Sequence, residues 1–191
     1  MTDPRQANAD SANSVVGWTA PSEDYLNLID PGDPTPRQRA VAEASDCGLV
    51  ALGIQEITFD IPVRGPYKDS SAFNLMYARA CGNPWAPGGA FRLATLDAPP
   101  QLGDVTEYGP APSGSPPAHM ETVLDSSVDG NKLSLTCAAG GERVNGLETI
   151  KIMKRTFTWG GAHWIDDQNK RPIIGVVDVE LLASMYPLKA A

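Results

Sequence analysis

Hydrophobic positions in the first half of the chain predict helices. Residues 47–54 are almost wholly apolar, which predicts a helix that is buried rather than one lying on the surface. Residues 70–81 carry apolar side chains at helical spacing and predict a further helix. Thr, Pro and Gln at a helix-start spacing predict a helix over 35–44. Residues 1–14 are polar and lack any period, so we expect a disordered tail there.

The second half of the chain predicts β-structure. Apolar and polar residues alternate over 118–124, Asp129-Gly130 is a strong turn signal, and 132–137 forms the return strand of a hairpin. Two more strands and a short closing helix are predicted at 148–159, 173–179 and 180–186. Helices followed by an antiparallel sheet predict a single α+β domain over residues 15–191.

Composition narrows the classes of function. A chain of 191 residues with a net charge of −8 fits one domain and disfavours a nucleic-acid partner. No apolar run is long enough to span a membrane and no signal-peptide pattern is present, so we expect synthesis in the cytoplasm and no membrane partner. Three scattered cysteines do not make a disulfide framework.

Cys47 has two interpretations. It opens the apolar segment 47–54, and Ser45 and Asp46 before it are good N-cap residues. A cysteine at a helix start lies at the positive end of the helix dipole, where a thiolate is stabilised and becomes a nucleophile. Free cysteines are also common as small buried hydrophobes, and this segment taken alone favours that second interpretation.

A cysteine hydrolase needs a base near the thiol and a group that orients the base. The chain has two histidines, His119 and His163. His163 follows Gly160-Gly161 in a predicted loop, which favours a role without catalysis. His119 begins a predicted strand, where it can face the end of a neighbouring helix, and it is the candidate base.

The predicted hairpin indicates which residues share a face with His119. A two-residue turn at Asp129-Gly130 places His119 opposite Gly140, and opposed residues share a face. That face comprises Glu121, Thr136, Ala138, Gly140 and, one step further, Glu142. Glu142 is therefore the candidate orienting residue and Thr136 a weaker one, whereas Cys137 points into the core. A one-residue bulge would reverse this assignment.

Three motifs in order resemble one family. Asp46-Cys47-Gly48-Leu49-Val50 resembles the Asp-Cys-Ser-Gly-Leu-Val motif of NlpC-type papain-like cell-wall peptidases. Leu102-Gly103-Asp104-Val105 resembles their Gly-Asp step, and Ala118-His119-Met120-Glu121-Thr122-Val123 resembles their histidine strand. The resemblance spans roughly residues 35 to 180. It implies a papain-like α+β fold with N-terminal helices packed on a C-terminal antiparallel sheet. It also implies a nucleophile at Cys47, a base at His119 and hydrolysis of amide bonds in peptidoglycan stem peptides.

Three features depart from the family pattern, one of them the absence of an aromatic-Gly-Gly segment before the cysteine, and the third catalytic residue motivates an alternative function. Gly48 stands where the family has serine, and Ala138 and Gly140 stand nearest to the family's third polar residue. The first hypothesis is a cysteine peptidase or amidase of the bacterial cell wall, acting as a phage lysis or tail protein or as an antibacterial effector. It would reach the periplasm or wall through a phage or a non-standard export route, and a toxin would need an immunity protein. The alternative is a catalytically inactive papain-like module that binds a peptide or a partner protein.

A metal site is the third hypothesis. Its ligands would be the remaining cysteines and the two histidines, namely Cys81, Cys137, His119 and His163. These residues lack the Cys-x-x-Cys or His-x-x-x-His spacings typical of metal sites, so this hypothesis ranks last. We therefore expect no metal and no cofactor.

Overall fold

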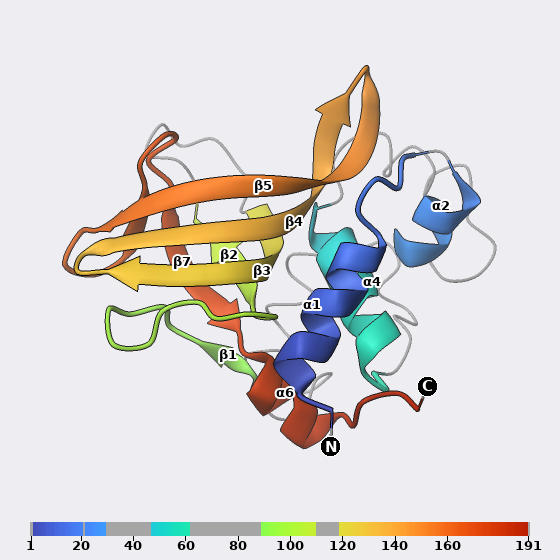
Figure 1. Ribbon diagram of the computed structural model, residues 1–191, viewed down its shortest axis with the longest axis horizontal. Helices are drawn as coiled ribbons and strands as arrows, with labels where there is room; N and C mark the ends of the chain where they lie inside the picture. Colours follow the sequence, from blue (N-terminus) through green and yellow to red (C-terminus); the bar gives the residue numbers. More distant parts are fainter. Residues whose placement is uncertain (1, 21, 30–46, 62–88, 110–118, 191) are drawn as a thin grey trace.

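A closed antiparallel barrel forms the body of the protein (Figure 1). The computed structural model describes residues 2–20, 22–29, 47–61, 89–109 and 119–190. Within these residues, six strands form the barrel: β2 (Val105–Tyr108), β3 (His119–Asp129), β4 (Lys132–Val144), β5 (Leu147–Trp159), β6 (Trp164–Asp166) and β7 (Pro172–Val177). Strand β7 closes the ring because it pairs with both β2 and β6. A short strand, β1 (Phe91–Arg92), pairs with the end of β7.

Apolar side chains fill the barrel. Strand registers place alternate residues of each strand on the inner face, as the pleat of a strand requires. The buried inner cluster comprises Ala94, Tyr108, Val123, Leu133, Leu135, Cys137, Phe157, Trp164, Ile173 and Val176. Large rings therefore occupy much of the interior, and the barrel is a packed core.

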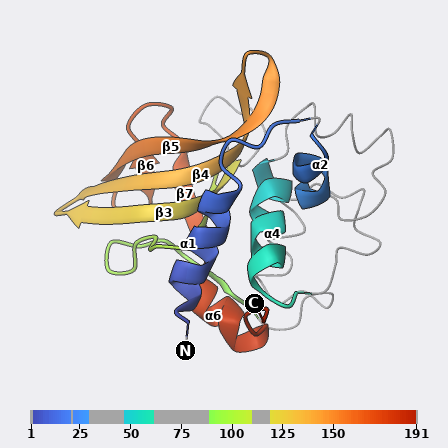
Figure 2. The ribbon, with the colours of Figure 1, turned by 45° about the vertical axis from the view of Figure 1, so that its right-hand side comes forward.

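Helices cover one side of the barrel (Figure 2). The described helices are α1 (Pro4–Ser14), α2 (Glu23–Ile29), α4 (Cys47–Thr58) and α6 (Val179–Met185). Helix α4 lies between α1 and α2 on one flank and β3 and β4 on the other, and it contacts all four elements. Among the described residues, no helix combines the length and apolarity needed to cross a membrane.

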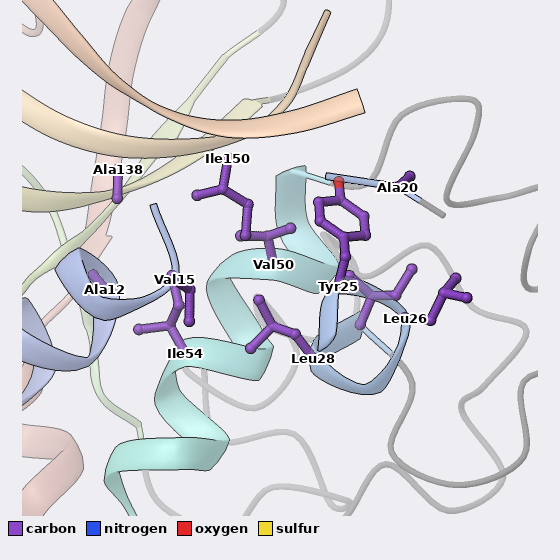
Figure 3. Packing of buried hydrophobic residues seen from close by; sticks show 11 residues of the cluster. Ala12, Val15, Ala20, Tyr25, Leu26, Leu28, Val50, Ile54, Ala138 and Ile150 are labelled. Atoms are coloured by element: carbon purple, nitrogen blue, oxygen red, sulfur yellow. The ribbon is translucent and has the colours of Figure 1, made fainter. Parts of the chain in front are cut away.

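The buried helix predicted from the apolar segment 47–54 is confirmed as α4. Val50 and Ile54 point from α4 into a cluster between the helices and the outer face of the barrel (Figure 3). Ala138 of β4 and Ile150 of β5 close this cluster on the barrel side. A helix with apolar residues on every face is buried between two layers, and that is the position of α4.

The papain-like α+β arrangement predicted from the sequence is wrong. The strands close into a barrel instead of forming an open sheet behind an N-terminal helical region. Closure depends on β7 pairing with β2 and with β6, which are far apart in the chain. Local alternation predicts that a strand exists but says nothing of such long-range partners. The helices predicted over 35–44 and 70–81 lie outside the described residues.

The disordered tail predicted over 1–14 is also wrong, because most of it forms α1. Two of its polar residues, Arg5 and Asn8, are buried against polar partners. The Arg5 guanidinium contacts Asp104 at 2.7 Å and Asp178 at 3.3 Å. The Asn8 amide donates to the Gly103 carbonyl at 2.7 Å. A segment that is polar throughout can therefore pack into a protein when another segment supplies its charge and hydrogen-bond partners.

Glu107 is a buried carboxyl group without a hydrogen-bond partner in the described part of the chain. The residue is 0 % exposed, and both oxygens of its carboxyl group are buried. Across the two ladders of β2 it lies opposite Met120 and Gly175, and neither offers a side-chain donor. Burial therefore disfavours the charged carboxylate and raises the pKa of Glu107 to about 7.

We predict that Glu107→Gln raises stability at alkaline pH. The usual carboxyl pKa is 4.5, and the folded value is about 7. Between these values the folded protein keeps a proton that the unfolded chain releases, so wild-type stability falls as the pH rises through this window. At about pH 8 the variant should be more stable by about 3 kcal/mol, and below the window the difference should vanish. Urea unfolding at both pH values measures this, and a difference independent of pH would contradict it.

Candidate active site

His119 and Glu121 form a hydrogen-bonded pair at one end of the barrel. They lie two residues apart on β3, so their side chains share a face. His119 Nε2 lies 2.8 Å from Glu121 Oε1. The Glu121 side chain is fully buried, whereas the His119 side chain is 17 % exposed at the start of the strand. The carboxylate therefore holds the imidazole from the inside and leaves its outer edge accessible.

Two further residues hold the Glu121 carboxylate. The Arg155 guanidinium donates from Nε to Oε1 and Oε2 at 2.9 and 3.0 Å, and from a terminal nitrogen to Oε1 at 2.5 Å. The Tyr108 hydroxyl donates to Oε2 at 2.9 Å. Burial alone would favour the neutral acid, but hydrogen bonds and positive charge from His119 and Arg155 outweigh it and lower the pKa of Glu121 to about 2. Glu121 is thus a carboxylate at neutral pH.

Cys47 is the second group that interacts with the imidazole. It is a free, partly buried thiol and the first residue of α4. Burial opposes a charge on His119, but hydrogen bonds and negative charge from Cys47 and Glu121 outweigh it and raise the pKa of His119 to about 10. Glu121 is hydrogen-bonded to Nε2, so Nδ1 is the ring nitrogen that this bond leaves free. The imidazole therefore interacts with a carboxylate and with a thiol.

A glycine on β4 allows α4 to bring Cys47 to this position. A Cβ on Gly140 would lie 2.5 Å from Cγ2 of Val50, one turn along α4 from Cys47. The missing side chain lets the first turn of the helix lie directly on the strand. Cys47 consequently stands at the N-terminus of α4, where the helix dipole stabilises negative charge. The N-cap residues predicted before it, Ser45 and Asp46, lie outside the described residues.

The orienting residue differs from the one predicted. Glu142 was expected to hold His119, but the carboxylate hydrogen-bonded to the imidazole belongs to Glu121. Glu142 is nearby, since one of its oxygens lies within 4.8 Å of His119 and Glu121 ligand atoms. Its ion pairs are with Lys151 at 3.4 Å and with Arg155 at 4.0 Å. The sequence did contain a signal for Glu121, because it lies two residues after His119. Residues i and i+2 of one strand share a face whatever the register of the hairpin.

Two irregularities, one in the β3–β4 ladder and one in the β4–β5 ladder, explain why the observed faces differ from the predicted ones. Asp129 pairs with Lys132, and an irregularity between Val123 and Asp125 then places Glu121 opposite Ala139. In this register the odd-numbered residues of β4, such as Cys137 and Ala139, share the face of His119. Thr136 therefore lies on the outer face of the barrel, and the prediction that it shares the face of His119 is wrong. A second irregularity follows between Ala139 and Glu142. It restores even-numbered residues to the inner side, and Glu142 reaches the neighbourhood of His119 for that reason.

Cys137 is buried inside the barrel, as predicted. Val123 lies opposite it and it packs in the inner cluster with Leu133 and Leu135. It nevertheless shares the face of Glu121, which the predicted register placed on the opposite side. Burial raises the pKa of the Cys137 thiol well above its usual value, so this thiol is a poor nucleophile.

The predicted metal ligands are not gathered in the described part of the chain. The one group of three potential ligands there is His119, Glu121 and Glu142, without Cys137 or His163. Cys81 lies outside the described residues. Glu121 already accepts hydrogen bonds from Arg155, whose positive charge would repel a cation. This group therefore fits an oriented imidazole better than a metal ion.

A pocket opens beside the imidazole at this end of the barrel. It has a volume of about 260 Å³. Residues of four strands and of the β6–β7 connection line it: Tyr108, His119, Glu142, Met153, Arg155, Asn169 and Arg171.

Comparison of the chain with protein-family models, with curated proteins and with solved structures gave no match in any of the three. The chemistry of the pocket is therefore interpreted from its own geometry.

Proposed function

We propose that the protein is a cysteine hydrolase that cleaves amide bonds. The observation that carries this proposal is the His119–Glu121 hydrogen bond together with Cys47, the first residue of α4, which interacts with the same imidazole. A protonated imidazole beside a thiol favours the thiolate, which is the nucleophilic form. Glu121 fixes the orientation of the ring and balances its charge, as the third residue of a catalytic triad does.

The proposed reaction has two steps. The Cys47 thiolate attacks the carbonyl carbon, and N–H groups at the start of α4 stabilise the oxyanion that forms. The carbon–nitrogen bond then breaks as His119 donates its proton to the leaving amine, which leaves a thioester on Cys47. Water adds to the thioester with His119 as base, releasing a carboxylic acid and restoring the thiolate. Proton donation to the amine is the reason that the pair suits amides.

The proposed substrates are stem peptides of bacterial peptidoglycan. This choice rests on the order of the cysteine, Gly-Asp and histidine motifs, which resembles that of NlpC-type peptidases. With this substrate, the protein would act as a phage lysis or tail protein, or as an antibacterial effector that reaches the wall by a non-standard route. An effector of this kind would have an immunity protein. The alternative of an inactive binding module was motivated by a doubtful third residue. Glu121 provides that residue, so the geometry favours catalysis.

Digestion of purified peptidoglycan tests this proposal. We expect the protein to release fragments with a new amine and a new carboxylate, each cleavage adding the mass of one water, as read by mass spectrometry. Prior treatment with iodoacetamide, with peptide mapping to confirm alkylation of Cys47, should prevent their release. Fast alkylation without fragments would overturn the choice of substrate. A folded protein that releases no fragments and whose Cys47 reacts no faster than free cysteine would overturn the hydrolase itself.

A further inference from the structure

The pocket beside His119 contains a positive charge that the proposed reaction does not use. Arg171 lines the pocket from the β6–β7 connection. In the part of the chain that the structure describes, its guanidinium has no ion-pair partner. Its backbone N–H donates to Asn169 Oδ1 at 2.9 Å, which fixes the two pocket residues relative to each other. The cation is therefore placed in the pocket by a short, hydrogen-bonded turn.

The other charges around the pocket compensate one another. Arg155 pairs with Glu121 and lies 3.6 Å from Asp166. Glu142, whose side chain is 25 % exposed, pairs with Lys151 at 3.4 Å. His119 is hydrogen-bonded to Glu121 and interacts with Cys47. Arg171 is thus the charge without a local counterpart, in a chain whose net charge is −8.

The shape and lining of the pocket indicate which group of a ligand would pair with Arg171. A volume of about 260 Å³ admits a small side chain or a chain terminus rather than an aromatic group with substituents. Met153 and the ring of Tyr108 supply apolar walls, and Asn169 adds a polar side chain beside the guanidinium. A guanidinium at a carboxylate makes two parallel, charge-assisted hydrogen bonds, which are among the strongest in proteins.

We propose that Arg171 binds a carboxylate of the substrate next to the bond that is cleaved. This inference rests on the proposed hydrolase function and specifies its substrates as acidic peptides. The carboxylate is either the end of the peptide or an acidic side chain within a residue or two of the reacting carbonyl. Arg171 acts as a specificity residue, because it touches the substrate but not the reacting atoms. A substrate with an amide in place of the carboxylate leaves the guanidinium unpaired.

Alkylation of Cys47 by matched probes tests this inference without turnover. Iodoacetyl-glycine carries a carboxylate and iodoacetyl-glycinamide does not, and a second pair with two glycines extends the reach. Each rate, followed by mass spectrometry, is divided by the rate with free cysteine. We expect the wild-type protein to prefer the acid over the amide by about tenfold for at least one pair. Arg171→Gln should remove this preference by lowering the rate with the acid toward the rate with the amide.

Lys170→Gln is the matched control. It removes the same charge one residue away, where the exposed ammonium donates to the Asp167 carbonyl and does not line the pocket. This variant should keep the preference for the acid. Equal rates for acid and amide in a reactive wild-type protein would overturn the role of Arg171 and leave the hydrolase standing. Equal loss of preference in both variants would also overturn it, whereas slow alkylation by every probe would overturn the hydrolase.

Discussion

Cys47→Ala is expected to abolish hydrolysis while leaving the fold intact. Removing the nucleophile of a catalytic triad lowers the rate by a factor on the order of 10⁴ or more. The stability cost should stay within about 1 kcal/mol, because the side chain is small and partly exposed and alanine is a good helix former. Rates of fragment release from peptidoglycan measure the first effect, and urea unfolding measures the second.

Cys137→Ala is the control for this prediction, since it removes another thiol of the same barrel. That thiol is buried in the inner cluster, so its loss should lower stability and leave the chemistry in place. In Cys47→Ala the pKa of His119 should also fall, because one of the two groups that raise it is gone. NMR titration of the imidazole detects this shift. Residual activity above about one hundredth of wild type would mean that another residue attacks the substrate.

The parts of the site that local sequence patterns predict are the helix and the imidazole. The apolar run after Cys47 predicts a buried helix, and α4 is buried between α1, α2 and the barrel. The position of His119 at the start of a strand predicts that it can face the end of a helix, and Cys47, the first residue of α4, is one of the groups that raise its pKa. Both predictions rest on periodicity within a few residues, which is the information that a single sequence carries best.

The parts that the sequence did not predict depend on contacts between distant segments. Barrel closure requires β7 to pair with two strands, and Arg5 is buried only because Asp104 and Asp178 lie near it in space. The hairpin turn consists of Gly130 and Asn131, one residue beyond the predicted pair. An irregularity between Val123 and Asp125 in the β3–β4 ladder then changed which residues of β4 share the face of His119. The carboxylate that holds His119 is therefore a different one from the residue predicted. A displacement of one residue in a strand reverses every side chain, so register is the least predictable feature of such a site.

Glu121→Gln is expected to lower both stability and activity. Glutamine has nearly the same shape but no charge, so the Arg155 guanidinium would lose the nearest of its ionic partners. Breaking a buried ion pair by removing one member typically costs about 3 kcal/mol or more. The imidazole would also lose the negative charge that orients it and balances its proton, for which we expect a rate loss of about 10² to 10⁴. Urea unfolding and peptidoglycan digestion measure the two effects.

Glu142→Gln makes the same chemical change near the same imidazole and serves as the control. Its carboxylate is partly exposed and its ion pairs are longer, at 3.4 and 4.0 Å. Such pairs contribute about 1 kcal/mol or less, and we expect a rate within about tenfold of wild type. If Glu142→Gln were as harmful to activity as Glu121→Gln, the orienting residue would be the one that the predicted hairpin register indicated.

The pH dependence of stability provides an independent test of the role of Glu121. Its pKa is lowered from 4.5 to about 2, so its contribution is present above about pH 4.5 and is lost as the pH falls toward 2. That shift corresponds to about 3 kcal/mol, which agrees with the cost expected from breaking the buried pair. Wild-type protein should therefore lose stability over this acid window, and Glu121→Gln should lose less, because only carboxylates such as Asp178, whose pKa is also lowered, still contribute. Glu107 acts between about pH 4.5 and 7 and in the opposite direction. The two variants should consequently change separate parts of one stability curve, and a flat acid limb in the wild-type protein would contradict the proposed pairing of Glu121 with Arg155 and His119.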